Sequence, residues 1–94
     1  MFRFTLAGRV VRKLVYIGHT ILVIEVDRAN ASFISCFVRD EDLKNKVDYG
    51  IATNGMVQVD GSIQWSNTVP PDAACCLVRF VAEIVAHIDD GAQQ

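Results

Sequence analysis

The sequence predicts an all-β domain in which five strands close into a small barrel, with one short helix between the third and fourth strands. Apolar residues recur at every second position in five stretches, which is the period of a half-buried strand. One charged stretch breaks this period and carries the signals of a helix. The chain has 94 residues, the length of one small domain, and we assign residues 1–90 to that domain and 91–94 to a frayed end.

The first two strands are separated by a turn at Gly18. In the first strand, an inward set alternates with arginine, threonine and alanine, and its members are Phe4, Leu6, Gly8 and Val10. The second strand covers His19–Arg28, where the inward set is Leu22, Ile24 and Val26. Both stretches therefore show the alternation of a strand with one buried face.

The third strand, Asn30–Asp40, has aromatic residues on the face that should meet solvent. Its buried face alternates through Ile34, Cys36 and Val38. Its opposite face is formed by Phe33, Ser35, Phe37 and Arg39. Because large exposed aromatic groups need an explanation when they cluster, this face is the first candidate for a functional surface.

The helix is predicted over Asp40–Gly50. Asp40 is a favourable N-cap, and acidic residues follow it in the first turn, where they interact well with the helix dipole. Lysines come later in the segment, and Gly50 ends it. The acidic cluster at its start is thereby explained as a helix N-terminus.

The last two strands are Met56–Trp65 and Cys75–Ile88. A turn at Thr53–Gly55 precedes the first of them. The stretch Ser66–Asp72 contains two prolines, which exclude it from the interior of a sheet, so it is a loop. Three strands, a helix and two strands is the order of an OB-fold barrel, in which the helix covers one end. An open β-meander crossed by a helix is the alternative.

Composition excludes several classes of protein. The chain is 51% hydrophobic and 21% charged, which excludes a disordered segment. No apolar run reaches the roughly 18–20 residues of a membrane span, and the amino terminus lacks the features of a secretory signal, so we expect a cytoplasmic protein without membrane contact.

Neither a metal site nor a catalytic site is indicated. The three cysteines lack C-x-x-C spacing, Cys75 and Cys76 are adjacent, and only His19 and His87 could assist them. We found no nucleophile with a neighbouring histidine, no phosphate-binding glycine loop and no spaced carboxylate set. The sequence therefore predicts a protein that is not an enzyme and that uses no metal or other cofactor.

Charge is unevenly distributed along the chain. Residues 1–39 hold six basic and two acidic side chains, whereas residues 40–94 hold three basic and nine acidic ones. The first part therefore carries +4 and the second −6, in agreement with the net charge of −2. This distribution is compatible with a local positive surface on an otherwise acidic protein.

The sequences of the predicted strands also resemble those of a known protein family. Leu6–Val10 (L-A-G-R-V), Gly18–Val26 (G-H-T-I-L-V-I-E-V) and Asn54–Ile63 (N-G-M-V-Q-V-D-G-S-I) are similar to strand motifs of bacterial single-stranded-DNA-binding proteins and of primosomal replication protein N. Ala82–Asp89 (A-E-I-V-A-H-I-D) resembles the closing strand of the primosomal member. The resemblance covers nearly the whole chain in the right order, although each motif is short.

The resemblance implies a binding role for the third strand. In that family a tryptophan on this strand stacks on a base, and Phe33 falls at the matching position, with Phe37 and Arg39 further along the same face. Exposed aromatic and cationic side chains together bind single strands with little sequence preference. Alternatively, Phe33 and Phe37 pack against a second subunit or beneath the loop Ser66–Asp72.

Further candidates surround this strand. Arg3 and Arg9 point outward from the first strand, with Arg12 and Lys13 just beyond it. Other candidate contacts are Tyr16, which we place in the loop between the first two strands, and Trp65, whose phase also suits a core or barrel-rim position. Glu25 falls on the same face and would weaken the binding of an anion.

Two departures from the family favour an accessory role. The loop between the fourth and fifth strands carries no basic residue, and the chain ends in H-I-D-D-G-A-Q-Q without an acidic tail and hydrophobic tip. We therefore expect a single-stranded nucleic-acid-binding accessory protein of DNA replication, recombination or repair. Its ligand is single-stranded DNA or RNA, and a replication or repair protein is a possible partner.

The alternative function is an OB-fold adaptor or oligomeric module that binds protein through Phe33, Phe37, Ile21 and Val23. Apolar residues also occur on both phases of the second and fifth strands, although a barrel buries only one phase. We therefore expect self-association into a homodimer or a larger homo-oligomer.

Overall fold

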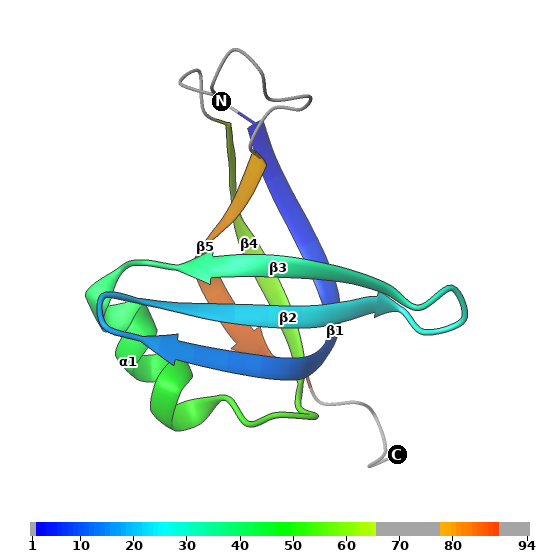
Figure 1. The fold of residues 1–94 in the computed structure, drawn as a ribbon, viewed down its shortest axis with the longest axis horizontal. Helices are drawn as coiled ribbons and strands as arrows, with labels where there is room; N and C mark the ends of the chain where they lie inside the picture. Colours follow the sequence, from blue (N-terminus) through cyan, green and yellow to red (C-terminus); the bar gives the residue numbers. More distant parts are fainter. Residues whose placement is uncertain (1, 66–77, 89–94) are drawn as a thin grey trace.

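The structure is a computed structural model, and it describes residues 2–65 and 78–88. Five strands and one helix follow each other along the chain in the predicted order (Figure 1). Their bounds are β1 Phe2–Tyr16, β2 His19–Asp27, β3 Ser32–Val38, α1 Glu41–Gly50, β4 Met56–Trp65 and β5 Val78–His87. The helix and the fourth strand match the prediction to within one residue.

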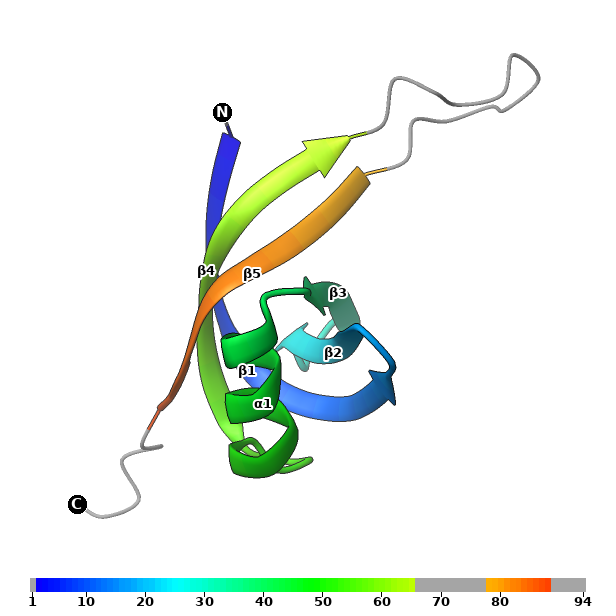
Figure 2. The same ribbon diagram turned by 90° about the vertical axis from the view of Figure 1, so that its left-hand side faces the viewer.

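The strands form a closed barrel in the order β1-β2-β3-β5-β4. All neighbouring pairs are antiparallel except β3 and β5, which are parallel over the short register Cys36↔Phe80 and Phe37↔Val81. This topology, with α1 between β3 and β4, confirms the predicted OB-fold barrel, and the alternative of an open meander is wrong. Figure 2 shows β4, β5 and the N-terminal part of β1 extending past β2 and β3.

The barrel interior is filled by aliphatic side chains from the inward phase of every strand. Leu22 and Ile24 of β2 are completely buried, as are Val10 of β1 and Val38 of β3. The helix covers one end of the barrel with Leu43 and Val47. Removal of a buried leucine side chain typically costs about 2–5 kcal/mol, so the strands keep this phase inside. The side chains that alternate with the buried ones therefore point outward from the barrel.

Gly8 and Gly61 allow neighbouring strands to approach closely. A Cβ atom at Gly8 would overlap the backbone carbonyl of Glu25 in β2, and one at Gly61 would overlap the carbonyl of Val81 in β5. These are the glycines of the first and fourth strand motifs in the sequence. Their role is therefore steric, because the barrel closes only where no side chain separates the strands.

Side chains of the barrel hold the helix in place. Asp40 caps the helix by accepting a hydrogen bond of 3.0 Å from the amide of Leu43. At the other end, Lys13 Nζ donates to the carbonyl oxygens of Asp48 and Ile51, both at 2.8 Å. A ring nitrogen of His87 lies 2.9 Å from the carbonyl oxygen of Gly50. Carbonyls that a helix leaves without partners at its C-terminus are thus satisfied from the barrel.

The first strand is longer than predicted. Arg12 and Lys13 lie within β1 rather than beyond it, and Tyr16 is the last residue of β1 rather than part of a loop. The β1–β2 register shifts between Val10 and Arg12, and this irregularity reverses which side chains point inward. A period-two pattern cannot show a strand that changes phase, which is why the prediction ended β1 too early.

The remaining differences are at segment ends. β2 ends at Asp27, and β3 is confined to Ser32–Val38, because a turn stabilised by hydrogen bonds between Asp27 and Asn30 separates them. The predicted loop Ser66–Asp72, residues 75–77 of the predicted last strand, and residues 91–94 lie outside the described residues. Within the described ranges, no helix has the length and apolar character needed to cross a membrane.

Candidate nucleic-acid interface

The outer face of β1, β2 and β3 presents side chains in rows that cross the strands. One row joins Arg9, Glu25 and Phe33, and the next joins Arg12, Val23 and Ser35. A third contains Leu14, Ile21 and Phe37. As predicted from the alternation, Phe33, Ser35 and Phe37 share this face, whereas Cys36 and Val38 are buried beneath it.

Aromatic rings form a continuous row at one end of this face. The Tyr16 and His19 rings are stacked with centroids 5.0 Å apart, and the His19 and Phe37 rings are stacked at 6.1 Å. The guanidinium of Arg79 lies over the Phe37 ring, 5.2 Å from its centroid. β1, β2, β3 and β5 each contribute one member, so this row, Tyr16–His19–Phe37–Arg79, depends on the closed barrel. We call it the aromatic row.

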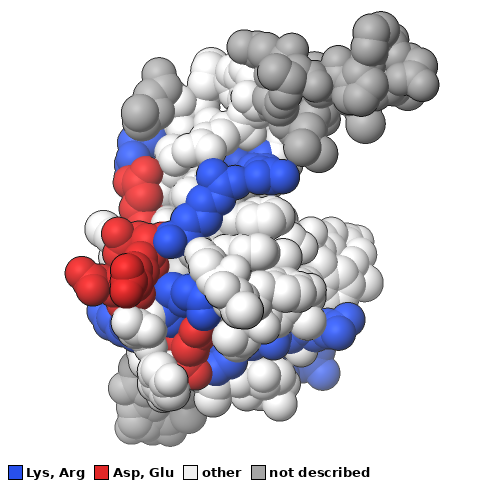
Figure 3. All heavy atoms as spheres, turned by 60° about the vertical axis from the view of Figure 1, so that its left-hand side comes forward, with Lys and Arg blue, Asp and Glu red and all other residues white. Residues whose placement is uncertain are grey.

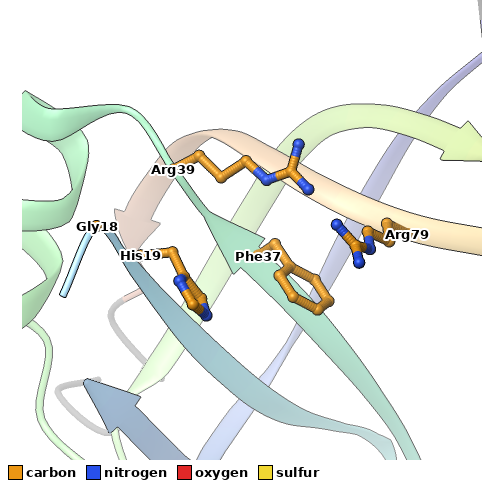
Figure 4. A pocket seen from close by; sticks show the side chains of 5 residues that line it. All are labelled: Gly18, His19, Phe37, Arg39 and Arg79. Atoms are coloured by element: carbon orange, nitrogen blue, oxygen red, sulfur yellow. The ribbon is translucent and has the colours of Figure 1, made fainter. Parts of the chain in front are cut away.

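A depression of about 320 Å³ opens beside the aromatic row. It is lined by Gly18, His19, Phe37, Arg39 and Arg79 (Figure 4). Both arginines point into the same space, and no acidic residue of the described ranges lines it. A space with aromatic walls and two guanidinium groups is chemically suited to a planar, negatively charged ligand.

Phe33 has different surroundings from Phe37. Its side chain is 51% exposed, and its cross-strand neighbour on β2 is Glu25. The two phenylalanines are four residue steps apart in an extended strand, which places them about 13 Å apart along β3. They can therefore contact two different parts of an extended ligand, but not the same group.

The predicted cations fall into four groups. Arg12 and Arg39 are exposed, Arg12 on the outer face of β1 and Arg39 directly after β3. Arg3 forms an ion pair of 2.9 Å with Glu83 of β5, and the hydrogen bond from Arg3 lowers the pKa of Glu83. Lys13 is turned to the helix carbonyls described above. Arg9 belongs to the face, but its cross-strand neighbour is the acidic Glu25.

Figure 3 shows how charge is arranged over one side of the molecule. Most of the acidic atoms gather toward one margin, where some basic atoms lie beside them, and other lysine and arginine atoms lie across the middle and toward the opposite margin. The separation agrees with the uneven charge along the sequence. A polyanion would thus meet a positive surface on a protein whose net charge is −2.

Trp65 lies at the rim, one of the two positions that its phase in the sequence allowed. It is 49% exposed, and its ring contacts that of Phe2 with centroids 4.9 Å apart. Phe2 is 59% exposed and was not predicted as a candidate. The pair forms a second exposed aromatic surface, on strands β1 and β4.

Sequence reasoning missed His19 and Arg79 as members of the site. His19 shares phase with Ile21 on the outward side of the second strand, and this was a visible signal. The phase of the last strand does not place Arg79 at the site, because Arg79 comes close to Phe37 only when β5 pairs with β3. The OB-fold topology, applied to the predicted strands, would have brought the two together.

The described residues offer little for metal or thiol chemistry. Residues 2–65 and 78–88 contain no group of three or more potential metal ligands. Cys36 is buried in the core, and this burial raises the pKa of its thiol to about 12. A thiol with this pKa stays protonated near neutral pH and is a poor nucleophile. Cys75 and Cys76 lie outside the described residues.

No protein-family model matches the chain, and no curated protein sequence matches it. Solved structures do. The mitochondrial single-stranded DNA-binding protein Rim1 of S. cerevisiae superimposes with a TM-score of 0.75 at 11% identity, over 93% of this chain and 92% of Rim1. A chain of the S. pombe Stn1–Ten1 complex gives 0.70 at 15% identity, over 99% of this chain and 62% of that one.

A third similar structure, the OBody AM1L10 bound to hen egg-white lysozyme, gives a TM-score of 0.69 at 16% identity, over 94% of this chain and 80% of the OBody. The likeness to all three is one of fold, since the identities are low. Together with the closed five-stranded barrel and its single described helix, it establishes that this chain has the OB-fold.

Proposed function

We propose that this protein binds single-stranded nucleic acid across the outer face of β1, β2 and β3. The aromatic row, which includes Arg79 and lies beside Arg39, is the observation that carries this proposal. Stacking on aromatic rings contributes about 1–3 kcal/mol per base and tolerates any sequence, because every base has a flat face. The ligand is therefore bound with little sequence preference.

The positive side chains around the row provide the second component of binding. Arg12, Arg39 and Arg79 lie on or beside the same face, where they can contact phosphates. Each phosphate contact releases counterions, so affinity falls as salt is added. Glu25 beside Phe33 opposes the binding of phosphates at the other end of the face, and a moderate affinity follows.

We further propose an accessory role in DNA replication, recombination or repair. The strand motifs resemble those of single-stranded-DNA-binding proteins and primosomal replication protein N, and one structural neighbour is a single-stranded DNA-binding protein. The primosomal type, cytoplasmic location, a replication or repair partner and the absence of enzymatic activity all remain predictions.

A fluorescence anisotropy titration with labelled oligo-dT tests the binding function. We expect saturable binding at low salt that weakens at moderate salt. A parallel titration with oligo-rU separates a preference for DNA from one for RNA, because only RNA has the 2′-hydroxyl. Absence of binding to both oligomers at low salt would contradict the proposal.

A protein-binding function is the alternative. One observation favours it: the OBody that shares this fold is bound to a protein, hen egg-white lysozyme. Phe33, Ile21 and Val23 lie on the same outer face and could contact a partner in this way. If the oligomers do not bind, this face should be tested as a protein interface.

We also propose that the protein self-associates. Ile84 of β5 is 56% exposed and pairs with Asp60 of β4, outside the proposed binding face of β1, β2 and β3. Apolar side chains outside the barrel are stabilised when a second copy covers them. Light scattering at micromolar concentration should therefore give a multiple of 10.4 kDa, whereas a mass near 10.4 kDa would contradict self-association.

A further inference from the structure

The depression beside Phe37 has room for about one nucleotide. Its volume is about 320 Å³, and pockets for small ligands begin at about 300 Å³. Its lining comes from four places in the chain: the turn after β1, the start of β2, the end of β3 and the start of β5. The closed barrel brings these segments together and so fixes the shape of the depression.

Two guanidinium groups face each other across this space. Figure 4 shows Arg39 and Arg79 extending toward one another above the Phe37 ring. Among the described residues, no Asp or Glu lines the depression, and the ion pairs involve Arg3 and Lys44 instead. Two like charges directed at one point repel each other unless an anion lies between them. Guanidinium groups bind phosphate through paired, charge-assisted hydrogen bonds.

The ring of Phe37 supplies the surface for a base. One face of this ring is covered by the Arg79 guanidinium at 5.2 Å, and the stacked His19 ring lies beside it. A cation over an aromatic ring is worth about 0.5–1 kcal/mol at an exposed site, less than the stacking of a base. A base can therefore replace the guanidinium, which then becomes free to contact a phosphate.

We propose that this depression binds one nucleotide unit, with its phosphate between Arg39 and Arg79 and its base against Phe37. This inference rests on the proposed function and adds a defined subsite to it. Gly18 belongs to the turn between β1 and β2, and Arg39 follows β3, so the subsite lies at one end of the binding face. Its phosphate is either the terminal phosphate of a strand or a phosphodiester within it.

Arginine variants of the whole protein test the subsite. Labelled oligo-dT of about ten nucleotides should bind Arg39→Gln and Arg79→Gln each roughly tenfold more weakly, the loss expected for one charge-assisted contact. The slope of log K against log salt should become shallower by about 0.7 in each variant. Arg28→Gln is the matched control, because Arg28 is an exposed arginine beyond the opposite end of β2. Its effect on either quantity should be well below that of the two subsite variants.

The ends of the oligomer distinguish the two sources of phosphate. Oligo-dT is prepared with a 5′-phosphate, with a 3′-phosphate or with neither, and the label is placed internally. For a terminal phosphate, one phosphorylated form binds at least about fivefold tighter, and this gain disappears in both arginine variants. For an internal phosphodiester, the three forms bind equally, and the variants weaken all of them.

The melting temperature of each variant should stay close to that of wild type, so that a loss of affinity reflects lost binding and not lost folding. Arg79→Lys keeps the charge but loses the flat guanidinium, so it should retain the wild-type salt slope while binding a few-fold more weakly. The subsite is wrong if Arg39→Gln and Arg79→Gln bind as Arg28→Gln does while wild-type binding persists. If wild-type protein binds no oligomer at low salt, the proposed function and the subsite both fail.

Discussion

Phe33 and Phe37 occupy the same face of β3, yet the structure gives them different neighbours. Phe33 is half exposed beside Glu25, and Phe37 is packed between His19 and Arg79. Phe33→Ala should weaken oligo-dT binding by roughly 1–3 kcal/mol, measured by anisotropy. Phe37→Ala should have a similar or smaller effect, because Arg79 already competes for its ring. Neither change opens a core cavity, so melting temperature and oligomer mass should stay close to wild type.

Two other aromatic residues provide the controls for this prediction. Tyr49 of α1 is 91% exposed and lies outside the aromatic row, so Tyr49→Ala should change neither affinity nor stability. Phe80 packs on the core and contacts the Phe4 ring at 5.2 Å, so Phe80→Ala should cost about 3–5 kcal/mol of stability. If Phe33→Ala instead unfolds or dissociates the protein, Phe33 is structural and the interface on β3 is wrong.

Lys13 shows how a cation that is plausible in the sequence can have a structural role. Its ammonium satisfies two carbonyl oxygens at the end of α1. Lys13→Met keeps the aliphatic part of the side chain and removes both hydrogen bonds, which should cost roughly 1–3 kcal/mol in a denaturant titration. Oligo-dT affinity should stay within about twofold of wild type. A large loss of affinity at unchanged stability would contradict this role and indicate that Lys13 contacts the ligand.

At the scale of elements, the contact between α1 and the barrel depends on Asp48. Its side chain is 11% exposed and accepts hydrogen bonds from Thr20 at 2.5 Å and from Lys44 at 2.6 Å. Burial alone would raise the pKa of Asp48. The hydrogen bonds from Lys44 and Thr20 and the charges of Lys44 and Lys13 outweigh this effect and hold the pKa below its usual value of 3.8.

A lowered pKa in the folded state makes this contact sensitive to acid. The stabilisation is complete above the unfolded pKa of about 4 and is lost as the pH falls through the lower folded pKa. Asp48→Asn should therefore reduce stability at pH 7 and flatten the decline of stability below about pH 4, measured by denaturant titration at each pH. If wild type and variant lose stability in parallel below pH 4, Asp48 does not govern the acid sensitivity.

The elements also show how far sequence reasoning reaches. α1 and Met56–Trp65 were predicted almost to the residue, because Asp40 caps the helix and β4 keeps one phase along its length. The end of β1 was missed because the irregularity after Val10 changes the phase. The phase of β3 placed Phe33 and Phe37 on the outer face. Arg79 joined them only through the pairing of β3 with β5, which local periodicity does not reveal.

For the whole molecule, the arrangement of charge matters more than its sum. The net charge of −2 would repel a polyanion at long range, whereas the arginines on and beside one face attract it at short range. Association should therefore be slower than for a strongly basic protein. Binding should release only a few counterions from the nucleic acid. The number of arginines that contact the ligand determines how strongly salt weakens binding.

The proposed binding face gives a specific expectation for this salt dependence. Arg3 is paired with Glu83, so we do not count it among the phosphate contacts. We count Arg79 because it lines the depression. If Arg9, Arg12, Arg39 and Arg79 are the phosphate contacts, there are about four per subunit. At about 0.7 per contact for single strands, the slope of log K against log salt should then be near −3. Anisotropy titrations at four or more salt concentrations measure it. A slope near zero would mean that these arginines do not contact phosphates, and one steeper than about −6 would require a footprint that extends over a second subunit.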